Sequence, residues 1–392
     1  MRLLRPLVIA AVAALTVTAG LLTAGPASAA PDVQTIFTKG ENGYGCHRIP
    51  AILRAGNGDL LAFAEARTEF CGDTGHIDLV MKRSTDDGAT WGKSQIVLQG
   101  TDDDPDAAAT RGNPVPILDE STGRIVLLST HNPSNADQPR TPYVQHSDDD
   151  GQTWSTAKSL GDVIDEPDWG WYATGPGGGI QLTRGEHAGR LVVGVNFSDG
   201  SGKNGAALVY SDDGGETWTR GATDVPATDD IIPQELNLFE RTDGGIYAAA
   251  RENAGTNTQT RAFAVSTDAG ASFEAPFKLI PDLVGTPKVQ GSILRLRATD
   301  SGDSYDRVLF ASPVHSKLRM TMTIRSSFDE GKTWQSVDEG TVIDEDRAGY
   351  SNMAVLGNGD IGLLYEAGAY PDGDARDDIR FARISESDLG VP

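Results

Sequence analysis

An eight-residue pattern, S-x-D-x-G-x-T-W, recurs along the chain and limits its fold more than any other feature. Four copies of this Asp-box end in Trp and a degenerate fifth ends in Phe: Ser84–Trp91, Ser147–Trp154, Ser211–Trp218, Ser327–Trp334 and Ser266–Phe273. Each follows a short run of apolar and β-branched residues, which is typical of a strand. Asp and Gly favour a tight turn, and the aromatic ring packs that turn against a sheet. The Asp-box therefore predicts a structural hairpin and not a catalytic motif.

A second repeat alternates with the first and supplies another hairpin. It consists of a strand, a turn rich in Gly, Asp or Asn, and an apolar strand, and its six copies begin at Ile49, Asn113, Gly178, Glu235, Gly291 and Asn352. Two hairpins make four strands, so six units predict an all-β, six-bladed β-propeller. No Asp-box follows Ile379–Ser385 in the sixth unit, and we expect Val33–Gly40 to supply its outer strand. Residues 30–392 then form a single domain.

The first 29 residues have the features of an export signal. Arg2 and Arg5 precede the apolar stretch Leu7–Leu22, and Ala27-Ser28-Ala29 is a small-residue cleavage site. No later apolar run approaches the roughly 18 residues of a membrane span. We expect a secreted, soluble protein, or a periplasmic one in a host with an outer membrane. Export favours a disulfide between Cys46 and Cys71, with free buried thiols as the alternative.

The charge of the chain excludes several classes of partner. A net charge of −23 opposes binding to nucleic acids or anionic membranes, although a local Arg cluster can still hold a small anion. The six histidines are scattered and form no metal-binding motif. We expect no metal or cofactor, with a surface calcium site as the open alternative.

Several segments resemble the bacterial exo-sialidases (neuraminidases) of glycoside hydrolase family 33. They are HRIPA from His47, FAEAR from Phe63, CGDTGHIDLVMKRS from Cys71, WYATGPGGGIQL from Trp171, ELNLFERTDG from Glu235, SKLRMTMTIRSS from Ser316 and AGYSNMAVLGNGDIGLLYE from Ala348. The resemblance implies a six-bladed propeller that removes terminal sialic acid from glycans, glycoproteins or glycolipids. We expect it to act as a monomer.

The resemblance assigns three arginines to the carboxylate of the sugar. They are Arg48, Arg251 and Arg319, and Glu366 corresponds to the acid that orients the first of them. A guanidinium is always charged and binds a carboxylate through two parallel hydrogen bonds, which suits this task. For any one of these arginines taken alone, a surface salt bridge is the alternative.

The resemblance also assigns a tyrosine, Tyr350, as the nucleophile and Glu235 as its base. Sialidases with a tyrosine nucleophile are a known exception among glycosidases. Sialic acid carries a carboxylate on its anomeric carbon, so an attacking carboxylate would meet like charge where a neutral phenol would not. A phenol needs a partner that removes its proton. A packed aromatic residue is the alternative for Tyr350.

Asp73 corresponds to the acid/base that protonates the leaving oxygen and then deprotonates water. That role predicts a raised pKa, supplied by a closed and partly desolvated loop. A turn-forming Asp is the alternative, and Asp78 is the nearest rival. Arg67 resembles a residue near O4 of the sugar, whereas Asn113 stands where many relatives have Asp. Trp169 and Trp171 stack on substrate or pack a loop.

Two other functions compete with hydrolysis of sialic acid. A propeller lectin would bind sialoglycans without cleaving them, and a relative with altered preference would hydrolyse the deaminated sugar or transfer sialic acid to an acceptor. The presence of Asp73, Glu235 and Tyr350 argues against the lectin.

Overall fold

The computed structural model describes residues 31–101, 108–133, 139–228, 230–253, 261–315 and 317–390. The chain divides into residues 1–30 and a unit from Pro31 to Pro392. The expected export signal, residues 1–29, lies outside the described residues. The second unit is built from strands, with the four-residue helix α1 (Gly161–Ile164) as the only α-helix among the described residues. The prediction of an all-β chain is confirmed.

The strands fall into six groups of successive antiparallel neighbours. The first comprises β2 (Cys46–Arg54), β3 (Leu60–Arg67), β4 (Ile77–Ser84) and β5 (Gln95–Leu98). The second comprises β6 (Thr110–Asp119), β7 (Arg124–Asn132), β8 (Thr141–Ser147) and β9 (Lys158–Ser159). The third comprises β10 (Trp169–Thr174), β11 (Ile180–Gln181), β12 (Leu191–Asp199), β13 (Asn204–Ser211) and β14 (Thr219–Asp224).

The remaining three groups follow the same plan. The fourth comprises β15 (Pro233–Glu240), β16 (Ile246–Glu252), β17 (Arg261–Ser266) and β18 (Lys278–Ile280). The fifth comprises β19 (Ser292–Arg297), β20 (Arg307–Pro313), β21 (Met320–Ser327) and the start of β22 (Thr341–Val355). The sixth comprises the end of β22, β23 (Ile361–Gly368), β24 (Asp378–Ile384) and β1 (Asp32–Thr38).

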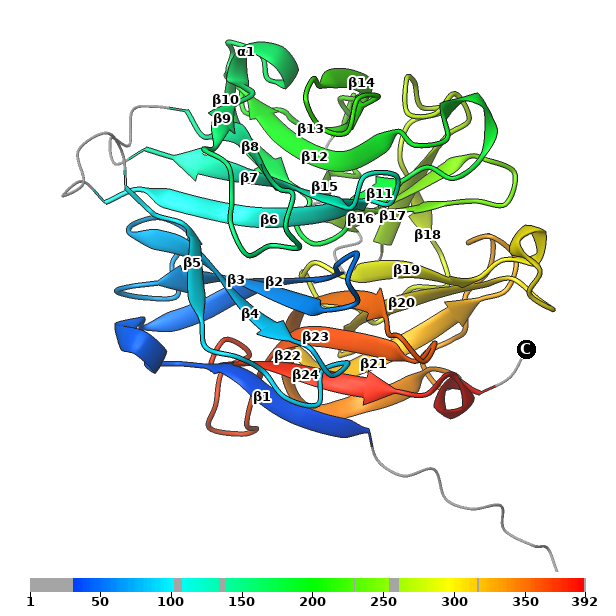
Figure 1. The fold of residues 1–392 in the computed structure, drawn as a ribbon. Helices are drawn as coiled ribbons and strands as arrows, with labels where there is room; N and C mark the ends of the chain where they lie inside the picture. Colours follow the sequence, from blue (N-terminus) through cyan, green and yellow to red (C-terminus); the bar gives the residue numbers. More distant parts are fainter. Residues whose placement is uncertain are drawn as a thin grey trace, which may run out of the picture. The chain divides into compact units, whose positions relative to one another are not determined.

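The N-terminal strand completes the last group, as the sequence predicted. Strand β1 pairs antiparallel with β24 from Asp32 opposite Arg383 to Thr38 opposite Asp378. Figure 1 shows this blue strand beside the red end of the chain. The two ends of the described unit are thereby held in one sheet.

Each group packs on the next through a buried apolar cluster, and the sixth group packs on the first. One cluster joins Leu61 and Phe63 of the first group to Leu127 of the second. Similar clusters join the second to the third, the third to the fourth, the fourth to the fifth and the fifth to the sixth. The last joins Phe381 of the sixth group to Ala62 of the first. The contacts between groups therefore form a closed series.

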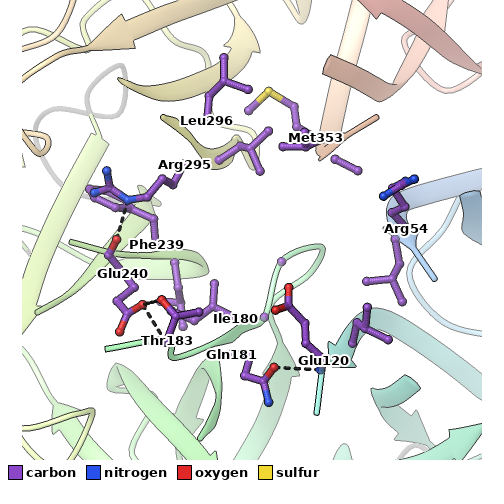
Figure 2. A pocket seen from close by; sticks show the side chains of 18 of the residues that line it. Arg54, Glu120, Ile180, Gln181, Thr183, Phe239, Glu240, Arg295, Leu296 and Met353 are labelled. Carbon is purple, nitrogen blue, oxygen red and sulfur yellow. Dashed lines mark hydrogen bonds between the residues drawn. The ribbon is translucent and has the colours of Figure 1, made fainter. Parts of the chain in front are cut away.

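The first strands of five groups, together with β11 of the third, also line one cavity of about 820 Å³. Figure 2 shows this cavity, with Phe239 from β15, Leu296 from β19 and Met353 from β22 among its walls. Segments more than 300 residues apart in the chain, such as Leu53 and Leu356, share its lining.

All five Asp-boxes fold into the same turn. In the first, the Asp86 carboxylate accepts hydrogen bonds from the Thr90 backbone N–H at 2.8 Å and the Thr90 hydroxyl at 2.6 Å. The Ser84 hydroxyl accepts from the Gly88 N–H at 2.8 Å, and Gly88 has the positive φ, 81°, that the turn requires. The same bonds recur around Asp149, Asp213, Asp268 and Asp329. Each of the five copies therefore forms the predicted turn.

Candidate active site

A second cavity, of about 500 Å³, lies at the opposite ends of the first strands. Strand β2, for example, contributes Ile49 to this cavity and Leu53 to the cavity in Figure 2. Three further predicted residues, Arg48, Arg319 and Glu366, contact those that line the second cavity, as described below. Six of the predicted site residues line it: Arg67, Asp73, Asn113, Glu235, Arg251 and Tyr350.

The first strands are bulged where they meet this cavity. In four of them, the register with the neighbouring antiparallel strand shifts. The shifts lie between Arg48 and Ala51, Gly112 and Val115, Gln234 and Asn237, and Ala348 and Ser351. Three residues in these bulges have positive φ: Ile49 at 55°, Asn113 at 51° and Glu235 at 48°. This conformation is strained for side chains other than Gly, most of all for β-branched Ile. A bulge changes the direction in which a side chain points. The strained backbone at these positions therefore accompanies side chains that are turned toward the cavity.

Tyr350 and Glu235 form the centre of the site. The Tyr350 hydroxyl donates a hydrogen bond to Glu235 Oε1. Arg251 Nη1 lies 2.8 Å from Glu235 Oε2 and 3.1 Å from the Tyr350 hydroxyl oxygen. Burial raises the pKa of Tyr350 well above its usual value, and the charge of Glu235 adds to the rise, while Arg251, Arg48 and Arg319 oppose it. A neutral phenol therefore stands beside a carboxylate that can take its proton.

Glu366 forms hydrogen bonds with two chain segments that are far apart in sequence. This fully buried carboxylate accepts hydrogen bonds from Arg48 Nε at 2.9 Å and Arg48 Nη2 at 3.2 Å. It also accepts from the backbone N–H of Ile49 and of Tyr350, both at 3.1 Å. One side chain thus sets the positions of both the first arginine and the tyrosine.

All three predicted carboxylate-binding arginines converge on Tyr350. The Arg48 and Arg319 guanidinium carbons lie 5.1 and 5.6 Å from the centre of its ring, and Arg251 bonds its hydroxyl. Arg319 is also held by a 3.0 Å hydrogen bond from Nη2 to the Lys288 carbonyl. Three guanidinium groups around one aromatic ring have the charge and the donors that suit a small carboxylate.

Asp73 lies on the loop after β3 and faces two arginines. Arg67 Nη1 donates to Asp73 Oδ1 at 2.9 Å and to the carbonyls of Cys71 and Gly72 at 2.7 Å each. Arg48 Nη1 lies 3.4 Å from Asp73 Oδ1. The structure joins Cys46 and Cys71 in a disulfide, which ties the loop to β2.

The prediction that the pKa of Asp73 is raised is wrong for the protein without a bound sugar. The loop leaves the Asp73 side chain 70% exposed. Partial burial favours a higher pKa, but the charges of Arg67 and Arg48 outweigh it and hold the pKa below its usual value. The rival Asp78 is a structural residue, since it is buried and accepts hydrogen bonds from the Tyr44 hydroxyl and the Gly100 N–H, both at 2.6 Å.

Two charged residues of the site escaped the sequence reasoning. Glu65 accepts hydrogen bonds from Arg67 Nε at 3.0 Å and from the Asn113 N–H at 2.8 Å. The sequence did hold a signal for Glu65, because residues two apart on a strand point to the same face and Glu65 lies two residues before Arg67. Arg140 donates to Asn113 Oδ1 and stacks over the ring of Trp171 at 4.4 Å. No motif surrounds Arg140, so the sequence offered no signal.

The two tryptophans outside the Asp-boxes have different positions. Trp171 lines the cavity, whereas Trp169 is buried in the core and stacks on Phe197. Among the described residues, no group of three or more His, Cys, Asp or Glu side chains is arranged to hold a metal ion. Among the described residues there is no helix with the length and the apolar character that crossing a membrane requires.

Comparisons with known proteins agree with the motifs. Residues 58–363 match the family described as the BNR repeat-like domain. A sialidase of Micromonospora viridifaciens is 32% identical over 91% of this chain and 54% of its own length. An exo-alpha-sialidase of Aspergillus fumigatus is 29% identical over 86% of this chain and 82% of its own length. The chain spans 54% and 61% of the first two curated relatives, the second being a sialidase of Bacteroides fragilis.

Solved structures show the same fold. A Hadza microbial sialidase superimposes with a TM-score of 0.77 at 23% identity, covering 91% of this chain and 68% of its own. An intramolecular trans-sialidase from Ruminococcus gnavus superimposes with a TM-score of 0.74 at 17% identity, covering 91% of this chain and 98% of its own.

Proposed function

The chain belongs to the BNR repeat-like domain family, and from this membership and its resemblance to sialidases we propose that it is an exo-α-sialidase. It hydrolyses terminal sialic acid from glycans, glycoproteins or glycolipids. The observation that carries the proposal is the Tyr350–Glu235 hydrogen bond beneath three converging arginines. A carboxylate-bearing sugar held by these arginines has its anomeric carbon beside the Tyr350 hydroxyl.

The first chemical step forms a bond between Tyr350 and the sugar. The Tyr350 oxygen attacks the anomeric carbon C2, and its proton passes to Glu235, which already accepts the hydrogen bond. Asp73 in its protonated form gives its proton to the glycosidic oxygen, so the C2–O bond breaks and the aglycone leaves as an alcohol. The carboxylate of the bound sugar offsets the charge of Arg48, which raises the pKa of Asp73 toward the value that this step needs.

The second step reverses the roles of these groups. Asp73, now ionised, takes a proton from water while the water oxygen attacks C2. The C2–Tyr350 bond breaks, and the phenolate recovers its proton from Glu235. Two displacements at C2 give net retention of anomeric configuration.

We also propose that the six strand groups are the blades of a closed propeller. The closed series of apolar clusters and the shared lining of the 820 Å³ cavity support this arrangement. In a ring, the ends of all six first strands approach one axis, which accounts for a site assembled from segments across the whole chain.

We further propose that the protein is exported and acts outside the cytoplasm as a monomer. The charged, apolar and small-residue parts of residues 1–29 support export. The Cys46–Cys71 disulfide supports it independently, since such bonds persist in oxidising compartments. Mass spectrometry of protein recovered from the culture medium tests it, with a mature N-terminus at Ala30 expected.

A turnover assay tests the proposed reaction. The protein should release free sialic acid from a fluorogenic α-sialoside, and NMR of the first product should show the α-anomer before mutarotation. Tyr350→Phe should fold normally and lose turnover. Binding of the sialoside without product would support a lectin, and transfer to an added acceptor would indicate a trans-sialidase.

A further inference from the structure

A covalent bond joins the loop that carries Asp73 to the strand that carries Arg48. Cys46 is the first residue of β2 and lies two residues before Arg48, and Cys71 lies two residues before Asp73. The disulfide between these cysteines spans 25 positions of the chain and holds their Cα atoms 5.4 Å apart. The candidate acid/base and one of the converging arginines therefore lie on two segments that the disulfide holds together.

The Asp73 loop, residues 69–74, has few other contacts. Its residues are exposed or half-buried. Among the described residues, its backbone is held by two hydrogen bonds, which the carbonyls of Cys71 and Gly72 accept from Arg67 Nη1 at 2.7 Å each. The same nitrogen donates to the Asp73 carboxylate at 2.9 Å. The position of the Asp73 loop therefore depends on Arg67 and on the disulfide.

The contact between Arg67 and Asp73 changes with the protonation of Asp73. Partial burial favours a higher pKa of Asp73, but the charges of Arg67 and Arg48 outweigh it and lower the pKa, so they stabilise the ionised form. The first step of the proposed reaction uses the protonated form, in which the charge-assisted hydrogen bond to Arg67 is lost. The disulfide is the same in both forms, so it restrains the loop when Arg67 attracts Asp73 least.

The other end of the disulfide has support of its own. Arg48 donates hydrogen bonds to Glu366 at 2.9 and 3.2 Å, and Glu366 also accepts from the Ile49 N–H at 3.1 Å. Cys46 and Arg48 are both buried in β2, which pairs with β3. Opening the disulfide would therefore free the exposed Asp73 loop more than it would free Arg48.

We propose that the Cys46–Cys71 disulfide positions Asp73 for protonation of the leaving oxygen. This inference rests on the proposed sialidase activity. Without the bond, the Asp73 loop moves relative to β2, and protonated Asp73 is less often within reach of the glycosidic oxygen. A misplacement of about 1 Å can cost about 10²-fold in rate. The loss should depend on the leaving group, because an aryl oxide departs with little help from an acid, whereas a sugar hydroxyl must be protonated as its bond to C2 breaks.

The test compares two substrates whose leaving groups differ in acidity. They are a methylumbelliferyl α-sialoside and the sialyllactose isomer that the wild type cleaves faster. In the double variant Cys46→Ala/Cys71→Ala, kcat/KM for sialyllactose should fall by about tenfold or more relative to kcat/KM for the aryl sialoside. Asp329→Ala is the control, because it removes hydrogen bonds in an Asp-box turn and should leave the ratio of the two values unchanged.

A second comparison shows whether the disulfide acts through Asp73. Asp73→Asn removes the acidic proton, so it should lower the same ratio by itself. Adding Cys46→Ala/Cys71→Ala to Asp73→Asn should then change the ratio no further, because the acid that the disulfide positions is already absent. A further fall of the ratio in the combined variant would show that the disulfide acts on another group and would overturn the inference.

Reduction of the folded wild type gives the same comparison if the double variant does not fold. A trialkylphosphine cleaves the disulfide: the two sulfurs become thiols, and the phosphine becomes its oxide with an oxygen from water. Mass spectrometry after alkylation counts the thiols, and circular dichroism checks the fold. An equal loss with both substrates, whether or not the protein unfolds, or no loss at all, overturns the inference while leaving the proposed function intact. A wild type that cleaves neither substrate overturns the proposed function itself.

Discussion

The carboxylates of the Asp-box turns have hydrogen-bond partners nearby in the chain, whereas those of the candidate active site have partners far away in the chain. In each box, the Asp receives hydrogen bonds from residues at most four positions away. In the site, Glu366 binds Arg48 across 318 positions and Glu235 binds Tyr350 across 115. The boxes are repeated and self-contained, whereas the site contacts join residues that are far apart in the chain. The turns of the scaffold are thus built from local interactions, and the site exists only where the scaffold brings distant residues together.

Substituting the nucleophile should give the largest effect and leave the scaffold unchanged. Tyr350→Phe removes the attacking oxygen, so kcat should fall on the order of 10³-fold or more. Its ring still packs with Ile49 and Val289, so the melting temperature should stay close to that of the wild type. Turnover and thermal unfolding measured on one preparation check this, and near-normal kcat would remove Tyr350 from the mechanism.

A change at Glu366 should lower both the stability of the fold and the activity of the site. Glu366→Ala leaves the buried Arg48 without its partner and frees the backbone of Ile49 and Tyr350. Breaking such a buried pair costs about 3–5 kcal/mol of folding free energy. We expect that loss in urea unfolding, together with a raised KM from a misplaced Arg48. Loss of activity without loss of stability would separate the two roles.

Removing a cation beside Asp73 should move the pH profile. The charge of Arg67 lowers the pKa of Asp73, so Arg67→Met should raise that pKa. Because the first step uses protonated Asp73, the alkaline limb of kcat/KM should shift to higher pH, by up to about one unit. A shift to lower pH would contradict the assignment of this limb to Asp73.

A box substitution should have the smallest effect. Asp329→Ala removes acceptors for the Thr333 N–H and hydroxyl, at a cost of about 1–2 kcal/mol, and should leave kcat unchanged. The pKa of Asp329 is lowered in the fold even though partial burial opposes this, because Thr333 and Ser327 donate to the carboxylate. The folding stability that Asp329 contributes is therefore present at pH values above its ordinary pKa of 3.8. It is lost as the pH falls through the lowered pKa. Urea unfolding at pH 7 and near pH 2 should show the difference shrinking, and a constant difference would count against this account.

Local patterns explain what could be predicted from the sequence. Hairpins and boxes depend on neighbours in the chain, so their residues reveal them. The pairing of β1 with β24 followed from a missing strand in the last unit. The arginines and Tyr350 were identified by resemblance, and the structure places them together.

The features that escaped prediction depend on contacts across the fold. Arg140 acquires its environment from Asn113 and Trp171, to which no sequence pattern connects it. The positive φ of Ile49 arises from a bulge that only the strand register reveals. The lowered pKa of Asp73 reflects two arginines and the exposure of its loop, which a raised-pKa expectation based on chemical role alone missed.

Trapping the covalent intermediate tests the central claim most directly. A 2,3-difluoro sialic acid, in its N-acetylated or deaminated form, transfers its sugar to the nucleophile and then turns over slowly, because fluorine at C3 destabilises the cationic transition state. Mass spectrometry of the proteolysed protein should locate the added sugar on the peptide that contains Tyr350, with one equivalent per chain. A sugar attached to Asp73 or Glu235, or no adduct in a protein that turns over sialosides, would contradict the account.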